Sequence, residues 1–131
     1  MKLKVVSVII LIAVCCMCFV GCCAKRLQLN ENSSAKLEYS CPDESKNFNL
    51  NLDGENSEKL IKELNKITYA EVGDDIVFEP SYDSLLITAG QNKIALYDVN
   101  ATLSNGGFFT YNGQLCKTDG SFAFLRDYIE I

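Results

Sequence analysis

An uncharged stretch near the N-terminus, residues 5–24, limits what the rest of the chain can fold into. Lys2 and Lys4 precede the stretch, and Lys25 and Arg26 follow it. A positive start, an apolar run and a small residue before a cut form the layout of a secretory signal. About 20 apolar residues also suffice to span a bilayer, so an uncleaved transmembrane anchor is an alternative. In either case we expect the folded part to follow this stretch and to face outward.

The stretch ends in Phe19-Val20-Gly21-Cys22. Residues 1–23 resemble the signal peptide of bacterial lipoproteins, whose lipobox places a small residue directly before a cysteine. The resemblance implies cleavage between Gly21 and Cys22, a lipid on the Cys22 thiol, and a lipid-anchored position on the extracytoplasmic face of the cell membrane. Phe19 departs from the pattern, which most often has leucine there. Cys23 is a second candidate thiol, and soluble secretion is a further alternative.

Removal of the predicted signal peptide, residues 1–21, leaves 110 of the 131 residues and changes the net charge from −5 to −7. Residues 22–34 are mostly polar and lack an apolar period, so we expect a lipid-bearing cysteine followed by a flexible tether. Residues 35–131 then form one globular domain. Nucleic-acid binding depends on a basic surface, so the acidic charge argues against a nucleic-acid partner.

Only two of the seven cysteines, Cys41 and Cys116, belong to the predicted domain. In an exported domain they could form one disulfide, which would stabilise the fold by about 4 kcal/mol. The alternative is two buried free thiols, because free cysteine is among the most buried residue types. The sequence does not decide between these two states.

The order of hydrophobic patterns predicts an α+β domain, with an antiparallel sheet of about six to seven strands and two helices packed on one face. Residues 36–41 and 47–52 alternate between apolar and polar side chains, as strands of a hairpin do. A helix begins at Asn56 or Ser57, and its apolar stripe is Leu60, Ile61, Leu64 and Ile67. Further strands are predicted at residues 76–78, 84–88 and 93–99, a hairpin around Asn112-Gly113, and a closing helix from Gly120 or Ser121. The layout is similar to that of many small lipoproteins of Gram-positive bacteria.

The chain contains no histidine. This excludes nucleophiles activated by histidine and histidine-bound catalytic zinc. Glu79, Asp83 and Asp74-Asp75 are acidic residues close in sequence that could bind a cation or a basic partner, although such clusters are usually solvated loops. The sequence therefore gives no catalytic residue, no metal site and no cofactor.

Aromatic residues gather in the later predicted strands. Tyr97, Phe109 and Tyr111 could lie on one exposed sheet face and form a binding surface, unless a loop or helix covers them. Together with the anchor, this indicates a non-catalytic binding module held at the membrane, with an extracytoplasmic protein or peptide as partner. The alternatives are an inhibitor or immunity-type protein, and a carboxylate-dependent hydrolase of the cell envelope.

Overall fold

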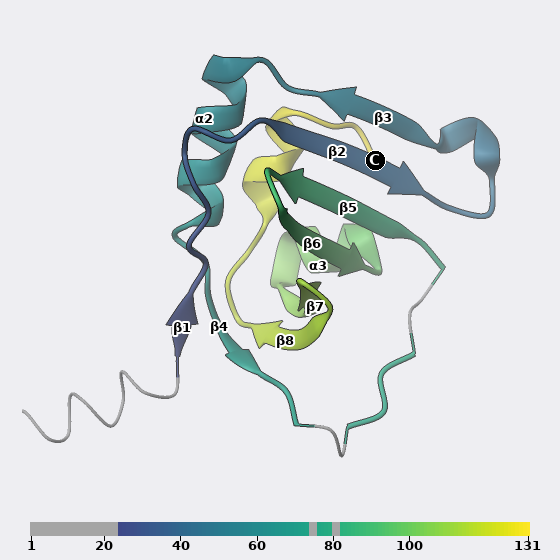
Figure 1. The fold of residues 1–131 in the computed structure, drawn as a ribbon. Coiled ribbons are helices and arrows are strands. Elements are labelled where there is room, and N and C mark those ends of the chain that lie inside the picture. The colour runs from purple at the N-terminus through teal and green to yellow at the C-terminus, as the bar shows by residue number, and fades with distance from the viewer. Residues whose placement is uncertain (1–23, 74–75, 80–81) are drawn as a thin grey trace, which may run out of the picture.

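The computed structural model describes residues 24–73, 76–79 and 82–131. The predicted cleavage and lipidation residues, Gly21 and Cys22, lie outside these ranges. The described part has the predicted α+β architecture, with eight antiparallel strands in the order β1-β4-β8-β7-β6-β5-β2-β3 (Figure 1). The strands are β1 (Lys25–Arg26), β2 (Ala35–Ser40), β3 (Phe48–Asn51), β4 (Thr68–Glu71), β5 (Ser84–Ala89), β6 (Asn92–Tyr97), β7 (Gly107–Tyr111) and β8 (Gln114–Thr118). The helices are α2 (Gly54–Leu64) and α3 (Val99–Asn105), with short 3-10 turns η1 (Glu44–Lys46) and η2 (Ala123–Asp127).

Two of the predicted hairpins turn at residues that accept a positive φ angle. Asn112 (φ 50°) and Gly113 (φ 85°) connect β7 to β8, and Gly90 (φ 61°) lies between β5 and β6. A positive φ costs asparagine and glycine less than other residues. β2 and β3 pair as predicted, with Leu37 opposite Leu50.

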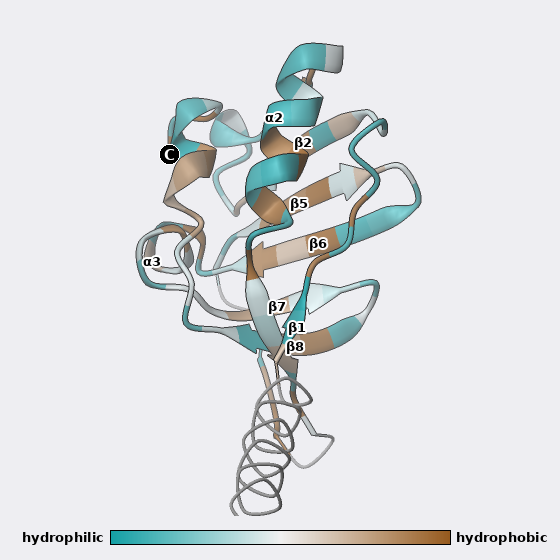
Figure 2. Ribbon diagram, turned by 90° about the vertical axis from the view of Figure 1, so that its left-hand side faces the viewer, coloured by the Kyte–Doolittle hydropathy of each residue, from teal (hydrophilic) through white to brown (hydrophobic). Residues whose placement is uncertain are grey.

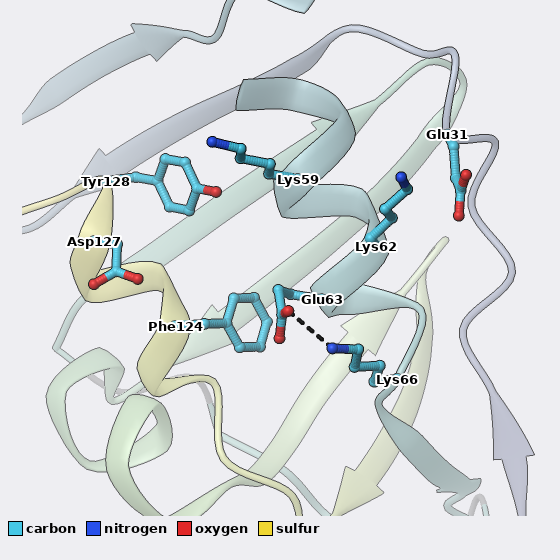
Figure 3. A pocket seen from close by; sticks show the side chains of 8 residues that line it. All are labelled: Glu31, Lys59, Lys62, Glu63, Lys66, Phe124, Asp127 and Tyr128. Carbon is cyan, nitrogen blue, oxygen red and sulfur yellow. Dashed lines mark hydrogen bonds and ion pairs between the residues drawn. The ribbon is translucent and has the colours of Figure 1, made fainter. Parts of the chain in front are cut away.

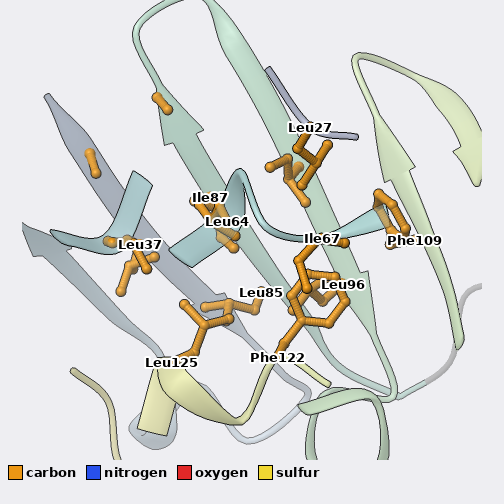
Figure 4. Packing of buried hydrophobic residues seen from close by; sticks show 14 of the residues in the cluster. Leu27, Leu37, Leu64, Ile67, Leu85, Ile87, Leu96, Phe109, Phe122 and Leu125 are labelled. Atoms are coloured by element: carbon orange, nitrogen blue, oxygen red, sulfur yellow. The ribbon is translucent and has the colours of Figure 1, made fainter. Parts of the chain in front are cut away.

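Helix α2 covers the inner face of the sheet with the predicted apolar stripe (Figures 2 and 4). Leu60, Ile61 and Leu64 are completely buried. The helix begins earlier than predicted because the carboxylate of Asp53 caps it, accepting a hydrogen bond from the backbone N–H of Asn56 at 2.7 Å. The apolar side chains that share the core with α2 come from the strands of the sheet and from η2 and the residue before it; they include Leu37, Leu85, Ile87, Leu96, Phe109, Phe122 and Leu125.

Three predicted elements differ from the structure. Residues 76–78 are not a strand, and Phe78 packs instead on the outer face of the sheet. The strand predicted at residues 93–99 ends at Tyr97, because Asp98 is left-handed (φ 48°) and α3 begins at Val99. The closing helix is only the five-residue turn η2. The sequence pattern also missed β4, in which three of the four residues are exposed and only Tyr69 is buried.

The tether predicted between the cysteine and residue 34 is wrong for the described residues. Lys25 and Arg26 pair with Tyr69 and Thr68 as strand β1. Leu27 and Leu29 are 1% and 4% exposed, which places them in the core. Two leucines separated by one polar residue are too short a pattern to indicate a strand, and the missing information is their hydrogen-bond partners, Ile67 and Asn65. We call residues 25–34 the N-terminal segment.

A side-chain amide fixes the N-terminal segment to the end of α2. The Oδ1 atom of Asn65 accepts a hydrogen bond from the Leu29 N–H at 2.7 Å, and its Nδ2 donates to the Leu29 carbonyl at 2.9 Å. The Leu27 N–H donates to the Ile67 carbonyl at 3.1 Å. Asn65 therefore satisfies both backbone groups of Leu29, as a neighbouring strand would. The folded domain begins at Lys25 rather than at residue 35.

Candidate functional site

The three aromatic residues predicted to share an exposed face do not do so. Phe109 is completely buried, and it pairs with Leu96 on the inner face. Tyr111 lies on the same face as Phe109, and the rings of both contact Tyr69 at centroid distances of 5.9 and 5.8 Å. Tyr97 follows Leu96 and therefore points to the opposite face. The register between β6 and β7 determines this separation, and the sequence does not show it.

Another set of rings does form a cluster on the outer face. Phe78 contacts Tyr97 and Phe108 at centroid distances of 5.3 and 5.6 Å. All three residues are half-buried. The ammonium group of Lys117 lies 5.5 Å from the centre of the Phe108 ring, within cation–π distance. We call Phe78, Tyr97 and Phe108 the outer aromatic cluster.

A cavity of about 360 Å³ opens beside the outer aromatic cluster, and we call it the outer pocket. It is bounded by the start and end of α3 and by the neighbouring loops. Two carboxylates, Glu79 and Asp98, reach it and are exposed to solvent. Neither has a cationic side chain within ion-pair distance among the residues that the structure describes. The other lining residues are Phe78, Tyr97, Ala101, Thr102, Asn105, Gly106, Gly107 and Phe108.

A distant carboxylate holds the start of α3, which forms one wall of the outer pocket. Asp98, at the N-cap position, makes no capping hydrogen bond with its side chain. Asp83 takes that role: its Oδ1 accepts a hydrogen bond from the Val99 N–H at 2.9 Å. Its Oδ2 accepts a hydrogen bond from the Tyr39 hydroxyl at 2.7 Å. Asp98 therefore keeps its carboxylate free for a ligand.

The far end of α3 is fixed by a backbone conformation that requires glycine. Gly106 has φ 73°, and a Cβ atom there would lie 2.8 Å from the Thr118 carbonyl. At the near end, the Thr102 hydroxyl donates a hydrogen bond to the Tyr97 carbonyl at 2.5 Å. The α3 wall of the outer pocket is thus held in place by part-buried hydrogen bonds, which reduces the ordering cost of binding.

A larger hollow of about 690 Å³ lies between the exposed side of α2 and η2 (Figure 3). It is lined by Glu31, Lys59, Lys62, Glu63, Lys66, Phe124, Asp127 and Tyr128. Each lysine has a carboxylate nearby: Lys59 with Glu55 at 3.6 Å, Lys62 with Glu58 at 3.0 Å, and Lys66 with Glu63 at 2.9 Å. The hydrogen bond with Glu58 raises the pKa of Lys62. Three lysines and three carboxylates line this hollow, so their charges balance, whereas the lining of the outer pocket has two carboxylates and no cation.

Of the two states that the sequence left open for Cys41 and Cys116, the structure has the free thiols and no disulfide. Cys116 is on β8, and Cys41 follows β2, with β7, β6 and β5 between them in the sheet. Four strand spacings amount to about 19 Å along the sheet, beyond the reach of a disulfide. Cys116 is buried, which raises the pKa of its thiol, whereas Cys41 is half-buried.

The described residues contain no group of three or more histidine, cysteine, aspartate or glutamate side chains placed to hold a metal ion. Of the four acidic residues noted in the sequence, Asp83 supports α3 and Glu79 lines the outer pocket; Asp74 and Asp75 lie outside the described ranges. Within those ranges no helix is long and apolar enough to cross a membrane. Comparison of the chain with protein-family models, curated proteins and solved structures finds no match in any of the three.

The bond between Tyr39 and Asp83 predicts a loss of stability at high pH. Burial, and then the hydrogen bond to Asp83, raise the pKa of Tyr39 above its ordinary value of 10.0. A raised pKa in the folded state stabilises the protein below pH 10.0, and this contribution is lost as the pH rises further. Tyr39→Phe should lower the free energy of unfolding by about 1 to 3 kcal/mol near neutral pH, because Asp83 loses a donor.

Urea titrations of the chain of residues 24–131 at about pH 8 and about pH 10.5 measure both effects. The wild type should lose more stability between the two pH values than Tyr39→Phe does. Tyr82→Phe is the matched control, because Tyr82 is 70% exposed. Equal pH dependence in the wild type and Tyr39→Phe would contradict the assignment.

Proposed function

We propose that this protein is a non-catalytic binding module, anchored by a lipid on Cys22 at the extracytoplasmic face of the cell membrane. In this proposal the outer pocket recognises a basic side chain, lysine or arginine, of a protein or peptide partner. The observation that carries it is the pairing of two uncompensated carboxylates, Glu79 and Asp98, with aromatic walls in one cavity. An inhibitor or immunity-type protein would be a special case of such a module.

The chemistry of the outer pocket favours a cation with an apolar stem. Aromatic faces attract ammonium and guanidinium groups, and the stems of lysine and arginine pack on apolar surface. Glu79 and Asp98 can accept the N–H groups of the cation. The volume of about 360 Å³ suits one side chain or a small ligand, at the lower end of typical ligand pockets. The ammonium group of Lys117 already lies over the Phe108 ring, so we expect the cation of the ligand to contact the rings of Phe78 and Tyr97.

A hydrolase that uses two carboxylates is the second candidate, because Glu79 and Asp98 line the same cavity. Such an enzyme needs one carboxyl group that stays protonated near neutral pH, and burial is the usual means of raising its pKa. Both residues here are exposed to solvent. Binding therefore explains the outer pocket better than catalysis does.

The pocket is tested by measuring the affinity of the chain of residues 24–131 for short peptides that contain arginine or lysine, by titration calorimetry. Asp98→Asn together with Glu79→Gln should weaken binding at least tenfold, about 1.4 kcal/mol, because the charge is lost. Asparagine accepts the left-handed backbone at position 98, so the fold is kept. Glu44→Gln, at an exposed carboxylate on η1, is the matched control and should leave affinity unchanged.

Peptides in which glutamine replaces the basic residue should bind much more weakly. The proposed ligand class would be refuted by equal affinity for the basic and the glutamine peptides, or by an unchanged affinity of the double variant. Hydrolysis of a peptide or peptidoglycan substrate that Glu79→Gln abolishes would instead favour the second candidate.

The anchor is tested by metabolic labelling of the full chain with a fatty acid. Cys22→Ala should prevent both cleavage and labelling and leave a larger, unprocessed form. Cys23→Ala, the matched control, should be processed and labelled normally. Normal labelling of Cys22→Ala would contradict the assignment. A transmembrane anchor predicts instead that the full-length protein stays in the membrane with or without Cys22.

A further inference from the structure

We infer that the bilayer surface itself is a binding partner of the folded domain, which rests on the membrane with Ile76 and Val77 in contact with lipid. This inference depends on the proposed lipid anchor at Cys22. Three observations support it: the connection between Cys22 and β1 is short, β1 begins at one end of the sheet, and exposed apolar side chains lie on the connection that leaves β4 at that end.

Only two residues, Cys23 and Ala24, separate Cys22 from β1, which begins at Lys25. The three Cα–Cα steps from Cys22 to Lys25 span at most about 10 Å. The N-terminal segment cannot lengthen this connection without losing the burial of Leu27 and Leu29 and the two hydrogen bonds from Asn65. A lipid on Cys22 would therefore hold this end of the domain against the headgroups rather than on a long tether.

The end of the domain that faces the membrane follows from the pairing of the strands. β1 and β4 are antiparallel, with Lys25 opposite Tyr69, so the chain leaves β4 at the end of the sheet where β1 begins. Val72, directly after β4, donates its N–H to the Leu115 carbonyl at 3.0 Å, which places the start of β8 at the same end. In Figure 1 the start of β1 and the connection that leaves β4 both lie at the lower edge of the domain.

Exposed apolar side chains emerge from this connection. Ile76 and Val77 are 48% and 87% exposed, and they are two of the four large hydrophobic residues exposed in the described ranges. The others are Tyr82 and Ile131. Single exposed apolar residues are common, but two adjacent ones on the connection that leaves β4 at the membrane-facing end fit insertion at the interface.

The contact should be hydrophobic rather than electrostatic. Lys25, at the start of β1, is already paired with Glu71 at 2.8 Å. Asp74 and Asp75 directly precede Ile76 in the sequence, so the residues next to the proposed lipid contact carry no excess of basic side chains. Anionic lipid would therefore be repelled, and neutral phosphatidylcholine is the lipid to test.

The contact also places the outer pocket near the membrane. Phe78 follows Val77 directly and forms part of the outer aromatic cluster. The segment that meets lipid therefore continues into a wall of the pocket. This arrangement favours partners whose basic side chains are held close to the bilayer surface.

The absence of tryptophan from the chain allows a direct test, because an introduced tryptophan is a unique fluorophore. Val77→Trp is prepared as the processed, lipidated protein and incorporated into phosphatidylcholine vesicles that contain nitroxide-labelled phosphatidylcholine. We expect its emission to shift to shorter wavelength and to be strongly quenched. Ile131→Trp is the matched control, because Ile131 is exposed and lies at the opposite end of the domain (Figure 1). Its emission should remain unquenched.

A second variant tests the role of the short connection. A flexible glycine-serine insertion between Ala24 and Lys25 should abolish the quenching of Val77→Trp while the protein still floats with the vesicles. Flotation without quenching of Val77→Trp, or equal quenching of Ile131→Trp, would overturn the inference and leave the lipid anchor intact. Loss of flotation by the otherwise unchanged protein would overturn both the anchor and the inference.

Discussion

The sheet has one face covered by helices and one face without them, and this asymmetry controls the rest of the structure. The inner face collects the apolar members of each alternating strand, and each fully buried leucine or isoleucine contributes about 1.5 to 3 kcal/mol. Helix α2 covers the part formed by β2, β5 and β6. At the other side β4 has only four residues and pairs with β8 over Ala70 and Glu71. Leu27 and Leu29 complete the core there, which explains why the N-terminal segment is folded.

The outer face has no helix to cover its aromatic residues. Tyr97 and Phe108 are half-buried because the connection after β4 places Phe78 on them. Phe78 covers these rings only in part, and the outer pocket lies between Phe78 and α3. The candidate site therefore results from the same asymmetry that determines the core. The carboxylate of Asp98 stays free because Asp83, from the connection between β4 and β5, caps α3 in its place.

Local patterns predicted the parts of the fold that local chemistry determines. The Asn112-Gly113 turn, the stripe of α2 and the alternation in β2 all follow from residues close in sequence. The remaining features depend on distant partners. The stability of α3 depends on Asp83, and the separation of Tyr97 from Phe109 depends on the register between β6 and β7.

The candidate site depends on contacts between segments that are distant in sequence. Nothing in the neighbourhood of Glu79 indicates that it lines a cavity together with Asp98 and the aromatic rings. The spacing of Cys41 and Cys116 does not reveal the strand order, which separates them by three strands. The pattern around Phe78 predicts a strand, whereas its ring covers part of the outer face of the sheet.

The central claim is that the chain is folded from Lys25 onward, and amide hydrogen exchange tests it most directly. In the processed protein, which begins at Cys22, the amides of Leu27 and Leu29 should exchange as slowly as those of α2, because Ile67 and Asn65 accept their hydrogen bonds. The amide of Asn32, which bonds only to the neighbouring side chain of Asn30, should exchange much faster. Exchange of Leu27 and Leu29 at the rate of an unstructured peptide would contradict the account and restore a flexible tether.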